Sequence, residues 1–396
     1  MAEMGKEGGI RIERVPVKTL CEFARSLDAN THSGDLNVLP IHRARAYARN
    51  PCADEADIGL LVAFMGEKPV GYLGIMPGQL KSAGKTSKVH WLTTWFVPEE
   101  FRDTAAGSLL MMTAISLRYD LLACAPDMGD EAQSVYRALG FKELGPLSFG
   151  RIEVERLNTL YRLLNAVQDR LNSIGASLPG IGRATRASVQ LYKPLRQRLY
   201  RRLLKSIRAD PADALTATEI SDMDSSLLRE PTESSPRFYR GHELLRWMLK
   251  DKWVLDRSET PGSGSSFFFS SVRDQFKYIT LKLTESKEGG EGFLILSASS
   301  NKGERTLKVL DYQLPTGVSE RSLGPIILER AQQADATLIL LPAHLRDLFE
   351  GIPAMKSILS TGSIYYFARA GRKNSMLAAV LDDIRIDFCD GDLAFT

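Results

Sequence analysis

The sequence has 396 residues, of which 44% are hydrophobic and 25% are charged, and its formal net charge is +3. This length exceeds what one ordinary hydrophobic core needs, so it predicts two domains and a connector. A charge this close to balance gives no argument for binding nucleic acid or an acidic polymer, and any such function must rest on a local cluster.

The four cysteines lie far apart and form no CxxC pair, which argues against a disulfide framework or a zinc site. We therefore expect no bound metal. The first residues carry charges and glycines where a signal peptide needs an apolar segment. No stretch approaches the roughly 18 apolar residues that a membrane-spanning helix needs. These features predict a cytoplasmic protein.

In chain order, the hydrophobic pattern of the first 150 residues alternates between helical and strand periods. It predicts helices at 17–27 and 40–49, strands at 58–64 and 70–75, a polar loop at 78–85, a strand at 89–97, a helix at 105–117, a buried strand at 121–125, a helix at 131–139 and a strand at 142–152. This order is typical of a mixed α/β sheet.

The next segment, 153–214, changes character. The run from Arg183 to Arg208 contains nine Lys or Arg residues and no acid. One interpretation is a basic helix in weak contact with an anionic surface, namely a membrane, a lipid-linked substrate or an acidic polymer. The other is a solvated connector whose arginine stems cover apolar neighbours. Both interpretations stay open at this point.

A second α/β region follows from 215 to 396. Its pattern predicts strands at 267–272, 278–283, 292–298 and 307–313, a helix at 323–334, a strand at 336–341, a short helix at 345–349 and a strand at 364–369. The last elements repeat the order found in the first half. We therefore predict three parts: 1–152, a basic helical connector at 153–214, and a diverged second copy at 215–396.

The segment that points to chemistry joins the strand at 89–97 to the helix at 105–117. Small residues open this helix, and exposed backbone N–H groups at a helix N-terminus among small side chains form a site for a phosphate. The residues concerned are Arg102, Asp103, Thr104, Ala105, Ala106, Gly107 and Ser108. Further on, a helix that contains Tyr136 ends at Gly140, and Phe141 opens the next strand.

In order and spacing these two segments resemble the GCN5-related N-acetyltransferase (GNAT) family, whose pyrophosphate loop reads Arg/Gln-x-x-Gly-x-Gly/Ala. The resemblance covers residues 10–150, with 215–370 as a suspected degenerate copy. It implies a tandem GNAT-like acyl-CoA N-acyltransferase fold with acetyl-CoA as the co-substrate. Ala105 replaces the first glycine of the motif, and Asp103 places a negative charge near the expected phosphates.

The resemblance also implies roles for individual residues. A backbone N–H of Phe96 or Val97 would polarise the thioester carbonyl. Tyr136 would protonate the departing thiolate as general acid. His90 is a candidate base because its ordinary pKa lies in the neutral range, with Glu99 and Glu100 as alternatives. A tyrosine packed in the core and a structural histidine are the competing interpretations.

The second half lacks these features. Its corresponding loop begins with Arg321 and reaches Gly324, but Pro325 removes a backbone N–H and Ile326 occupies the final small position. We expect this half to form a non-catalytic wall. The first functional hypothesis is transfer of an acetyl or other acyl group to an amine or hydroxyl of a small or sugar-type acceptor. The alternatives are an aminoacyl-tRNA-dependent transferase and a non-catalytic binding protein of the same fold.

Overall fold

The computed structural model describes residues 9–30, 36–125, 130–154, 193–207, 214–229, 236–251, 253–259, 272–287, 289–301, 303–371 and 375–392. Among the helices of these ranges, none has both the length and the apolar character needed to cross a membrane.

The first half folds in the order β1 (Ile10–Pro16), η1 (Val17–Thr19), α1 (Leu20–Asn30), α2 (Ile41–Ala48), β2 (Ile58–Met65), β3 (Lys68–Ser82), β4 (Lys85–Phe96), η2 (Glu99–Phe101), α3 (Ala106–Ser116), β5 (Leu121–Cys124), α4 (Asp130–Ala138) and β6 (Lys142–Glu153). Strands alternate with helices as the sequence pattern predicts, so the mixed α/β class is confirmed.

The connector contributes α7 (Lys193–Ser206). The second half then runs β7 (Leu215–Ile220), η5 (Ser225–Leu227), β8 (Arg237–Phe238), α8 (His242–Lys250), β9 (Leu255–Asp256), η6 (Arg257–Glu259), β10 (Val272–Arg273), β11 (Gln275–Glu285), β12 (Glu291–Asn301), β13 (Glu304–Gln313), η7 (Glu320–Ser322), α9 (Leu323–Gln333), β14 (Leu338–Pro342), α10 (Ala343–Glu350), η8 (Pro353–Met355), β15 (Leu359–Ala370), α11 (Ser375–Val380) and η9 (Leu381–Asp383). From β11 to β15 this order repeats that of β2 to β6.

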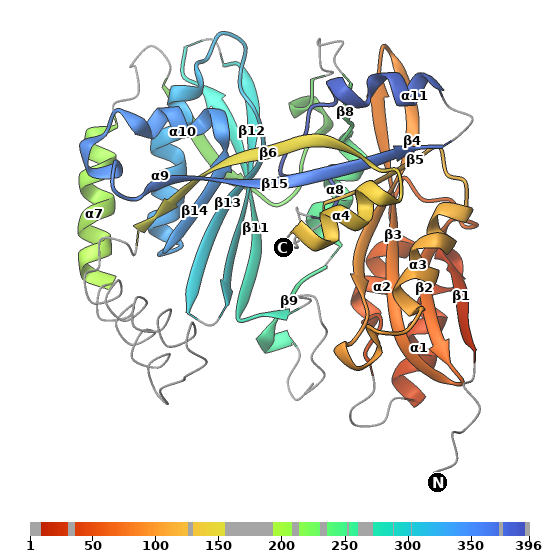
Figure 1. Ribbon diagram of the computed structural model, residues 1–396. Coiled ribbons are helices and arrows are strands. Elements are labelled where there is room, and N and C mark those ends of the chain that lie inside the picture. Colours follow the sequence, from red (N-terminus) through yellow and green to blue (C-terminus); the bar gives the residue numbers. More distant parts are fainter. Residues whose placement is uncertain are drawn as a thin grey trace.

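One continuous sheet joins the two halves, in the order β1-β2-β3-β4-β5-β15-β6-β14-β13-β12-β11-β7, with β8 paired to β3 (Figure 1). The order is symmetric about its centre. In each half the fourth and fifth strands are parallel, β4 with β5 and β13 with β14. The sixth strands are exchanged: β15 pairs with β5, and β6 pairs with β14, all antiparallel. Because the sheet does not break at residue 152 or 215, the division into three parts stays a prediction.

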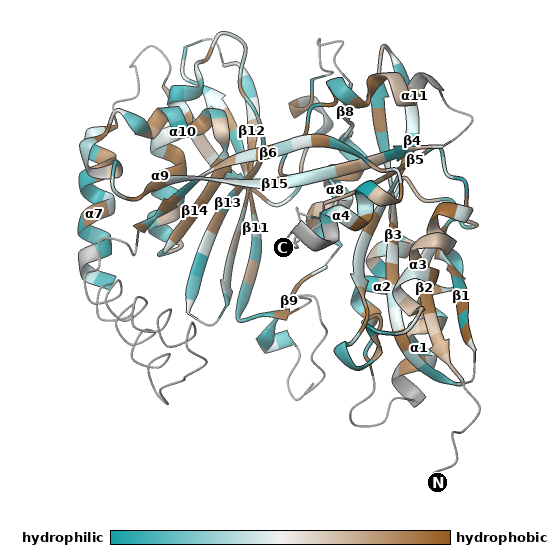
Figure 2. Ribbon diagram, viewed as in Figure 1, coloured by the Kyte–Doolittle hydropathy of each residue, from teal (hydrophilic) through white to brown (hydrophobic). Residues whose placement is uncertain are grey.

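Three hydrophobic cores lie on the two faces of this sheet. Residues alternate between faces along each strand, so Leu61 and Leu73 point to one core and Val62 and Tyr72 to another. One core extends over both halves and packs against α1, α2 and α8. The opposite face carries two separate cores, one under α3 and α4 and one under α7, α9 and α10. Figure 2 shows the hydrophobic colour concentrated on the inner strands of both halves.

The structure corrects three expectations. The polar loop predicted at 78–85 is wrong, because β3 continues to Ser82 and the turn to β4 occupies Ala83 and Gly84. Leu80 is fully buried there, so its polar neighbours lie on a strand. The strands β1 and β7 and the helix α8 were not predicted. Of the strand expected at 267–272, residues 267–271 lie outside the described residues, and residue 272 opens the short β10.

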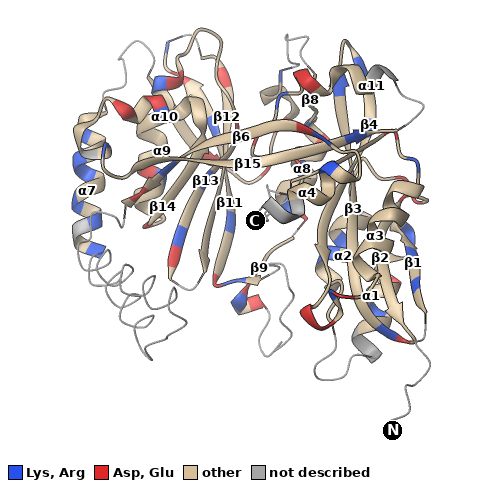
Figure 3. Ribbon diagram, viewed as in Figure 1, with Lys and Arg blue, Asp and Glu red and all other residues tan. Residues whose placement is uncertain are grey.

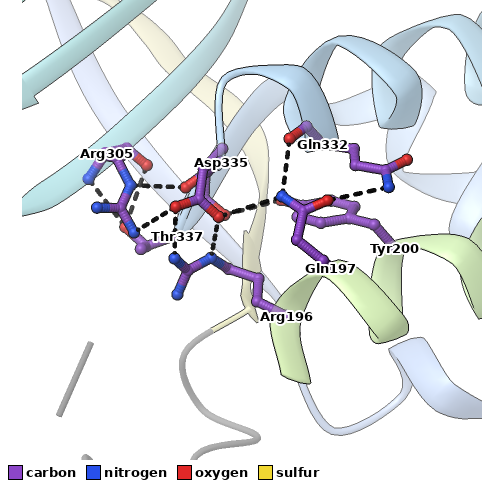
Figure 4. A network of polar contacts seen from close by, with 8 residues as sticks. Arg196, Gln197, Tyr200, Arg305, Gln332, Asp335 and Thr337 are labelled. Atoms are coloured by element: carbon purple, nitrogen blue, oxygen red, sulfur yellow. Dashed lines mark hydrogen bonds and ion pairs between the residues drawn. The ribbon is translucent and has the colours of Figure 1, made fainter. Parts of the chain in front are cut away.

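The basic connector is described from residue 193 to 207, so Arg183 and Arg208 lie outside the described residues. Helix α7 packs against α9, with Tyr200 and Leu203 fully buried. Arg196 is also buried, and its guanidinium forms two hydrogen bonds with Asp335, at 2.9 and 2.7 Å (Figure 4). The Arg196 side chain therefore holds the connector against the second half. The other basic residues of α7 lie on its exposed face (Figure 3): Lys193, Arg198, Arg201, Arg202 and Lys205.

Candidate functional site

The candidate site lies where β4 and β5 separate. These parallel strands pair from His90 to Leu92, and after Leu92 no further pairing with β5 is formed. At this point β4 bulges, because Thr93 pairs with Gly74 and Phe96 pairs with Tyr72. Two residues, Thr94 and Trp95, therefore face a single residue of β3. A bulge at the mouth of a gap between strands re-aims the side chains that follow it.

Thr94 has a φ of 49°, in the left-handed region that a β-branched residue rarely adopts. Such strain persists where the surroundings impose it, and it is frequent at functional sites. Gly74 makes the bulge possible. A β-carbon on Gly74 would lie 2.4 Å from the Thr93 hydroxyl and 3.0 Å from both the Thr94 and the Tyr47 hydroxyls.

The N-terminal turn of α3 lies beside this gap. Thr104 accepts a hydrogen bond from the Ala106 N–H and donates one to the Phe101 carbonyl, which fixes the turn before the helix. The N–H groups of Gly107 and Ser108 donate to no carbonyl or side chain of the described residues, as expected for the first turn of a helix. Ser108 is exposed, and so are Arg102, Asp103 and Ala105. The turn therefore presents free donors to solvent.

Trp95 closes one side of this turn. A β-carbon on Gly107 would lie 3.5 Å from the Trp95 ring and 3.6 Å from a methyl of Val97, so both side chains pack against the first turn of α3. The Nε1 of Trp95 is buried and has no hydrogen-bond partner among the described residues. This indole N–H, 3.8 Å from the same position, is a further donor beside the free backbone groups.

Tyr136 lies on α4 behind the gap and is buried. Its hydroxyl contacts the thiol of Cys124, the last residue of β5, and burial, with a smaller effect of this thiol, raises the pKa of Tyr136 well above its usual value. Its ring packs on Phe141 and Phe367, at centroid distances of 5.3 and 5.9 Å. The phenol therefore stays protonated throughout the physiological range, as a general acid must.

His90 lies elsewhere. It occurs where β4 and β5 are still paired, four residues before Thr94, and its side chain is 4% exposed. Its ring stacks on Tyr119 at 3.4 Å, and its Nε2 lies 3.4 Å from Asp57. Burial lowers its pKa to about 4, against the opposing effect of Asp57. This environment is typical of a structural histidine, and a base role for His90 stays a prediction.

The structure adds a carboxylate that the sequence pattern did not indicate. Beside the main effect of burial, the negative charge of Asp392 raises the pKa values of Tyr47, Cys124 and Tyr136. Asp392 is therefore close enough for its charge to act on all three groups. No motif surrounds it in the sequence, and no local signal could have found it. Glu99 and Glu100 are exposed in η2, beyond the end of β4.

The corresponding turn of the second half is covered. Ser322 and Leu323 at the start of α9 are buried, and a β-carbon on Gly324 would lie 3.4 Å from a methyl of Ile207, next to the end of α7. The connector therefore occupies the position where the first half presents free N–H groups.

Comparison with known proteins agrees with this geometry. The model of the acetyltransferase (GNAT) family matches residues 24–141, which include the bulge, the α3 turn and Tyr136. Residues 24–141 belong to the GNAT family. No curated protein sequence matches the chain.

One solved structure shares its fold with nearly the whole chain. A conserved protein of unknown function from Enterococcus faecalis, described as a probable N-acyltransferase, aligns over 93% of this chain and 74% of its own, with 11% identity and a TM-score of 0.52. This likeness shows a shared fold. A GCN5-related N-acetyltransferase from Anabaena variabilis aligns over 92% of this chain and 74% of its own, with 12% identity and a TM-score of 0.47. Eis1 from Mycobacterium abscessus aligns over 94% and 76%, with 14% identity and a TM-score of 0.45.

The described residues contain no group of three or more His, Cys, Asp or Glu side chains arranged to hold a metal ion. Cys21, Cys52, Cys124 and Cys389 are all free thiols.

Proposed function

We propose that the first half transfers an acetyl or other acyl group from acyl-CoA to an amine or hydroxyl of a small or sugar-type acceptor, and that the second half does not. The observation that carries this proposal is the contrast between the two helix N-termini. The first turn of α3 is open with two free backbone N–H groups, whereas that of α9 is buried beneath Ile207.

The residues at α3 fit the pyrophosphate of acyl-CoA. The N–H groups of Gly107 and Ser108 would hold its oxygens, since helix N-termini favour anions, and Arg102 adds a positive charge. Ala105 at the first glycine position has ordinary helical φ, so its methyl imposes no strain. Three large hydrophobic residues of this surface are exposed on α3 and α4 and would contact apolar parts of the co-substrate: Leu109, Met112 and Val135.

The acyl-CoA supplies an activated thioester, which the acceptor attacks directly. The pairing of β4 with β5 ends at Leu92, and the extended arm would lie between the two strands beyond this residue. After the bulge at Thr94, Trp95 and Val97 pack against the first turn of α3. The backbone N–H of Phe96 or Val97 would donate to the carbonyl oxygen as negative charge develops on it. The Tyr136 phenol would then give its proton to the leaving sulfur.

The acceptor must lose a proton to a base. His90 is the base predicted from the sequence, and Asp392 is the candidate that the structure adds, because its charge acts on both Tyr47 and Tyr136. Removal of the proton by solvent is the remaining option.

The test is acetyl-CoA binding followed by thiol release. Binding should raise the melting temperature of the full chain, and the free thiol of CoA should appear when an acceptor amine is supplied. Binding without thiol release from a wide set of amines and alcohols would favour the non-catalytic alternative. The absence of any binding at millimolar acetyl-CoA would refute the proposal.

A further inference from the structure

A cavity lies in the second half of the molecule, at the opening between β13 and β14. These strands pair from Thr306 to Lys308, and beyond this point they separate as β4 and β5 do. The cavity has a volume of about 500 Å³, which is within the range of small-molecule sites. Its floor is apolar and belongs to the large core, where Phe238, Phe293 and Leu310 are buried.

The walls carry charges of both signs. Four arginines and three acids line the cavity. Arg240 lies between two of these acids, 3.1 Å from Asp311 and 3.4 Å from Asp387, and also contacts the buried Asp390. One arginine faces three carboxylates in this cluster, so the cluster offers no positive charge to a ligand. Glu320 is the third acid of the lining, and a positive charge for a ligand must therefore come from an arginine outside the Arg240 cluster.

Arg229 supplies a positive charge at the edge of this cavity. Its guanidinium donates to the Thr316 hydroxyl and to the Glu291 carbonyl oxygen, the latter at 2.8 Å. Neither acceptor is ionised, and within the described residues no carboxylate pairs with Arg229. A guanidinium held by neutral groups retains its charge for an anion, which it can bind through two parallel N–H donors.

A chain of polar atoms lies along the same wall. The Tyr312 hydroxyl donates to Glu320, and the Nε2 of His344 lies 2.6 Å from the Tyr312 oxygen. A phenol has one proton to give, so His344 must be the donor to Tyr312. These groups combine acceptors and donors in fixed positions, as recognition of several hydroxyl groups requires.

We propose that this cavity is a second ligand site, separate from the acyl-CoA site, and that it binds a small hydroxylated anion, either a sugar phosphate or a sugar acid. Arg229 holds the anionic group, and the Glu320–Tyr312–His344 chain holds hydroxyl groups. The apolar floor contacts the carbon face of the ring. The inference does not rest on acyl transfer, because the α3 turn contributes nothing to this cavity.

The experiment is calorimetric titration of the full chain, without acetyl-CoA, with four probes: glucose 1-phosphate, glucuronate, glucose and inorganic phosphate. Either glucose 1-phosphate or glucuronate should bind more tightly than glucose or phosphate, and the comparison identifies the anionic group. Arg229→Gln should weaken binding of the preferred probe about tenfold, the typical effect of losing one charge-assisted contact. Arg321→Gln removes another exposed arginine that does not line the cavity and should leave the binding of this probe unchanged.

Two outcomes would overturn the proposal. One is the absence of saturable binding for both hydroxylated anions. The other is equal weakening by Arg229→Gln and Arg321→Gln, which would reduce the effect to overall charge. Tyr312→Phe should weaken the hydroxylated anions and leave phosphate unaffected, and a uniform loss would contradict the hydroxyl contact. Gly107→Glu should preserve binding in this cavity. The acyl-transfer proposal therefore stands if the cavity proposal fails, and the cavity proposal stands if the acyl-transfer proposal fails.

Discussion

Substituting Gly107 by glutamate tests where the acyl-CoA phosphates bind. The structure gives the new side chain room, because the nearest atom to a β-carbon at this position is 3.5 Å away, an ordinary contact. Gly107 lies in the first turn of α3, where a negative charge interacts favourably with the helix dipole. Glutamate is also a better helix former than glycine. The melting temperature of the free variant should therefore equal or exceed that of the parent protein.

The rise in melting temperature that acetyl-CoA causes should be smaller in Gly107→Glu than in the parent protein. At a hundredfold excess over Kd, a ligand stabilises the folded state by about 2.7 kcal/mol. With an unfolding entropy of about 2.1 cal/mol/K per residue, a chain of 396 residues has about 0.8 kcal/mol/K, so the parent protein should gain about 3 °C. A carboxylate about 5 Å from a phosphate charge costs about 1–3 kcal/mol per charge at effective dielectric constants between water and protein.

Two phosphate charges then lower the affinity at least about thirtyfold, and the shift at the same ligand concentration falls to about 1 °C or less. The assay is thermal unfolding with and without acetyl-CoA. Ser116→Glu is the matched control, since it adds the same charge to an exposed position about 14 Å along the same helix. A full shift in Gly107→Glu would place the ligand elsewhere, and an equal loss in Ser116→Glu would show that position does not matter.

Three further predictions concern the remaining groups. Tyr136→Phe should lower the turnover rate by a factor of about 10²–10⁴ at nearly unchanged acetyl-CoA affinity, and full activity of this variant would make the hydroxyl structural. Because burial raises the pKa of this phenol, the pH–rate profile of the parent enzyme should show no loss of activity from its ionisation below about pH 10. If Asp392 is the base, Asp392→Asn should lower the turnover rate and His90→Gln should keep it. Because burial lowers the pKa of His90 from 6.5 to about 4, the unfolded state binds a proton in this pH window that the folded state does not, and the parent protein loses up to about 3 kcal/mol of stability as pH falls through it. Urea titrations should find this loss reduced in His90→Gln, and a slower but equally stable His90→Gln would restore the base role. Gln substitutions at the exposed α7 residues Arg198, Arg201 and Arg202 should weaken binding to anionic vesicles or RNA by about 1 kcal/mol per residue. Arg196→Gln should lower thermal stability instead, because it breaks a buried ion pair. No binding even at low salt would return α7 to a connector role.

The helices that carry the candidate site were predictable where their signal is local. Small residues after a strand indicate the α3 turn, and a helix that ends at Gly140 before Phe141 indicates α4. The bulge was not predictable, because the strand propensity of threonine favours extended backbone and gives no sign that Thr94 adopts a left-handed conformation. The constraint comes from its neighbours, where Gly74 lets the Thr93 and Tyr47 hydroxyls meet at 2.6 Å.

The strand exchange was also hidden from the sequence. The alternation in β6 shows that this segment is a strand, but it does not say which strand will be its partner. The same limit applies to the connector. Its composition predicted a basic helix, yet the burial of Arg196 depends on Asp335, which lies 139 residues further along the chain. Pairings over such separations depend on the whole fold.

The exchange explains why a half without an open phosphate turn is still needed. Strand β15 of the second half pairs with β5 and brings Phe367, fully buried, against the ring of Tyr136. The wall behind the proposed acid is therefore built by the second half, and the first half alone lacks it. In return, β6 brings Ile152 into the core beneath α7 and α9. Each half completes the other, so the second half supports the first even though the first turn of α9 is covered by Ile207.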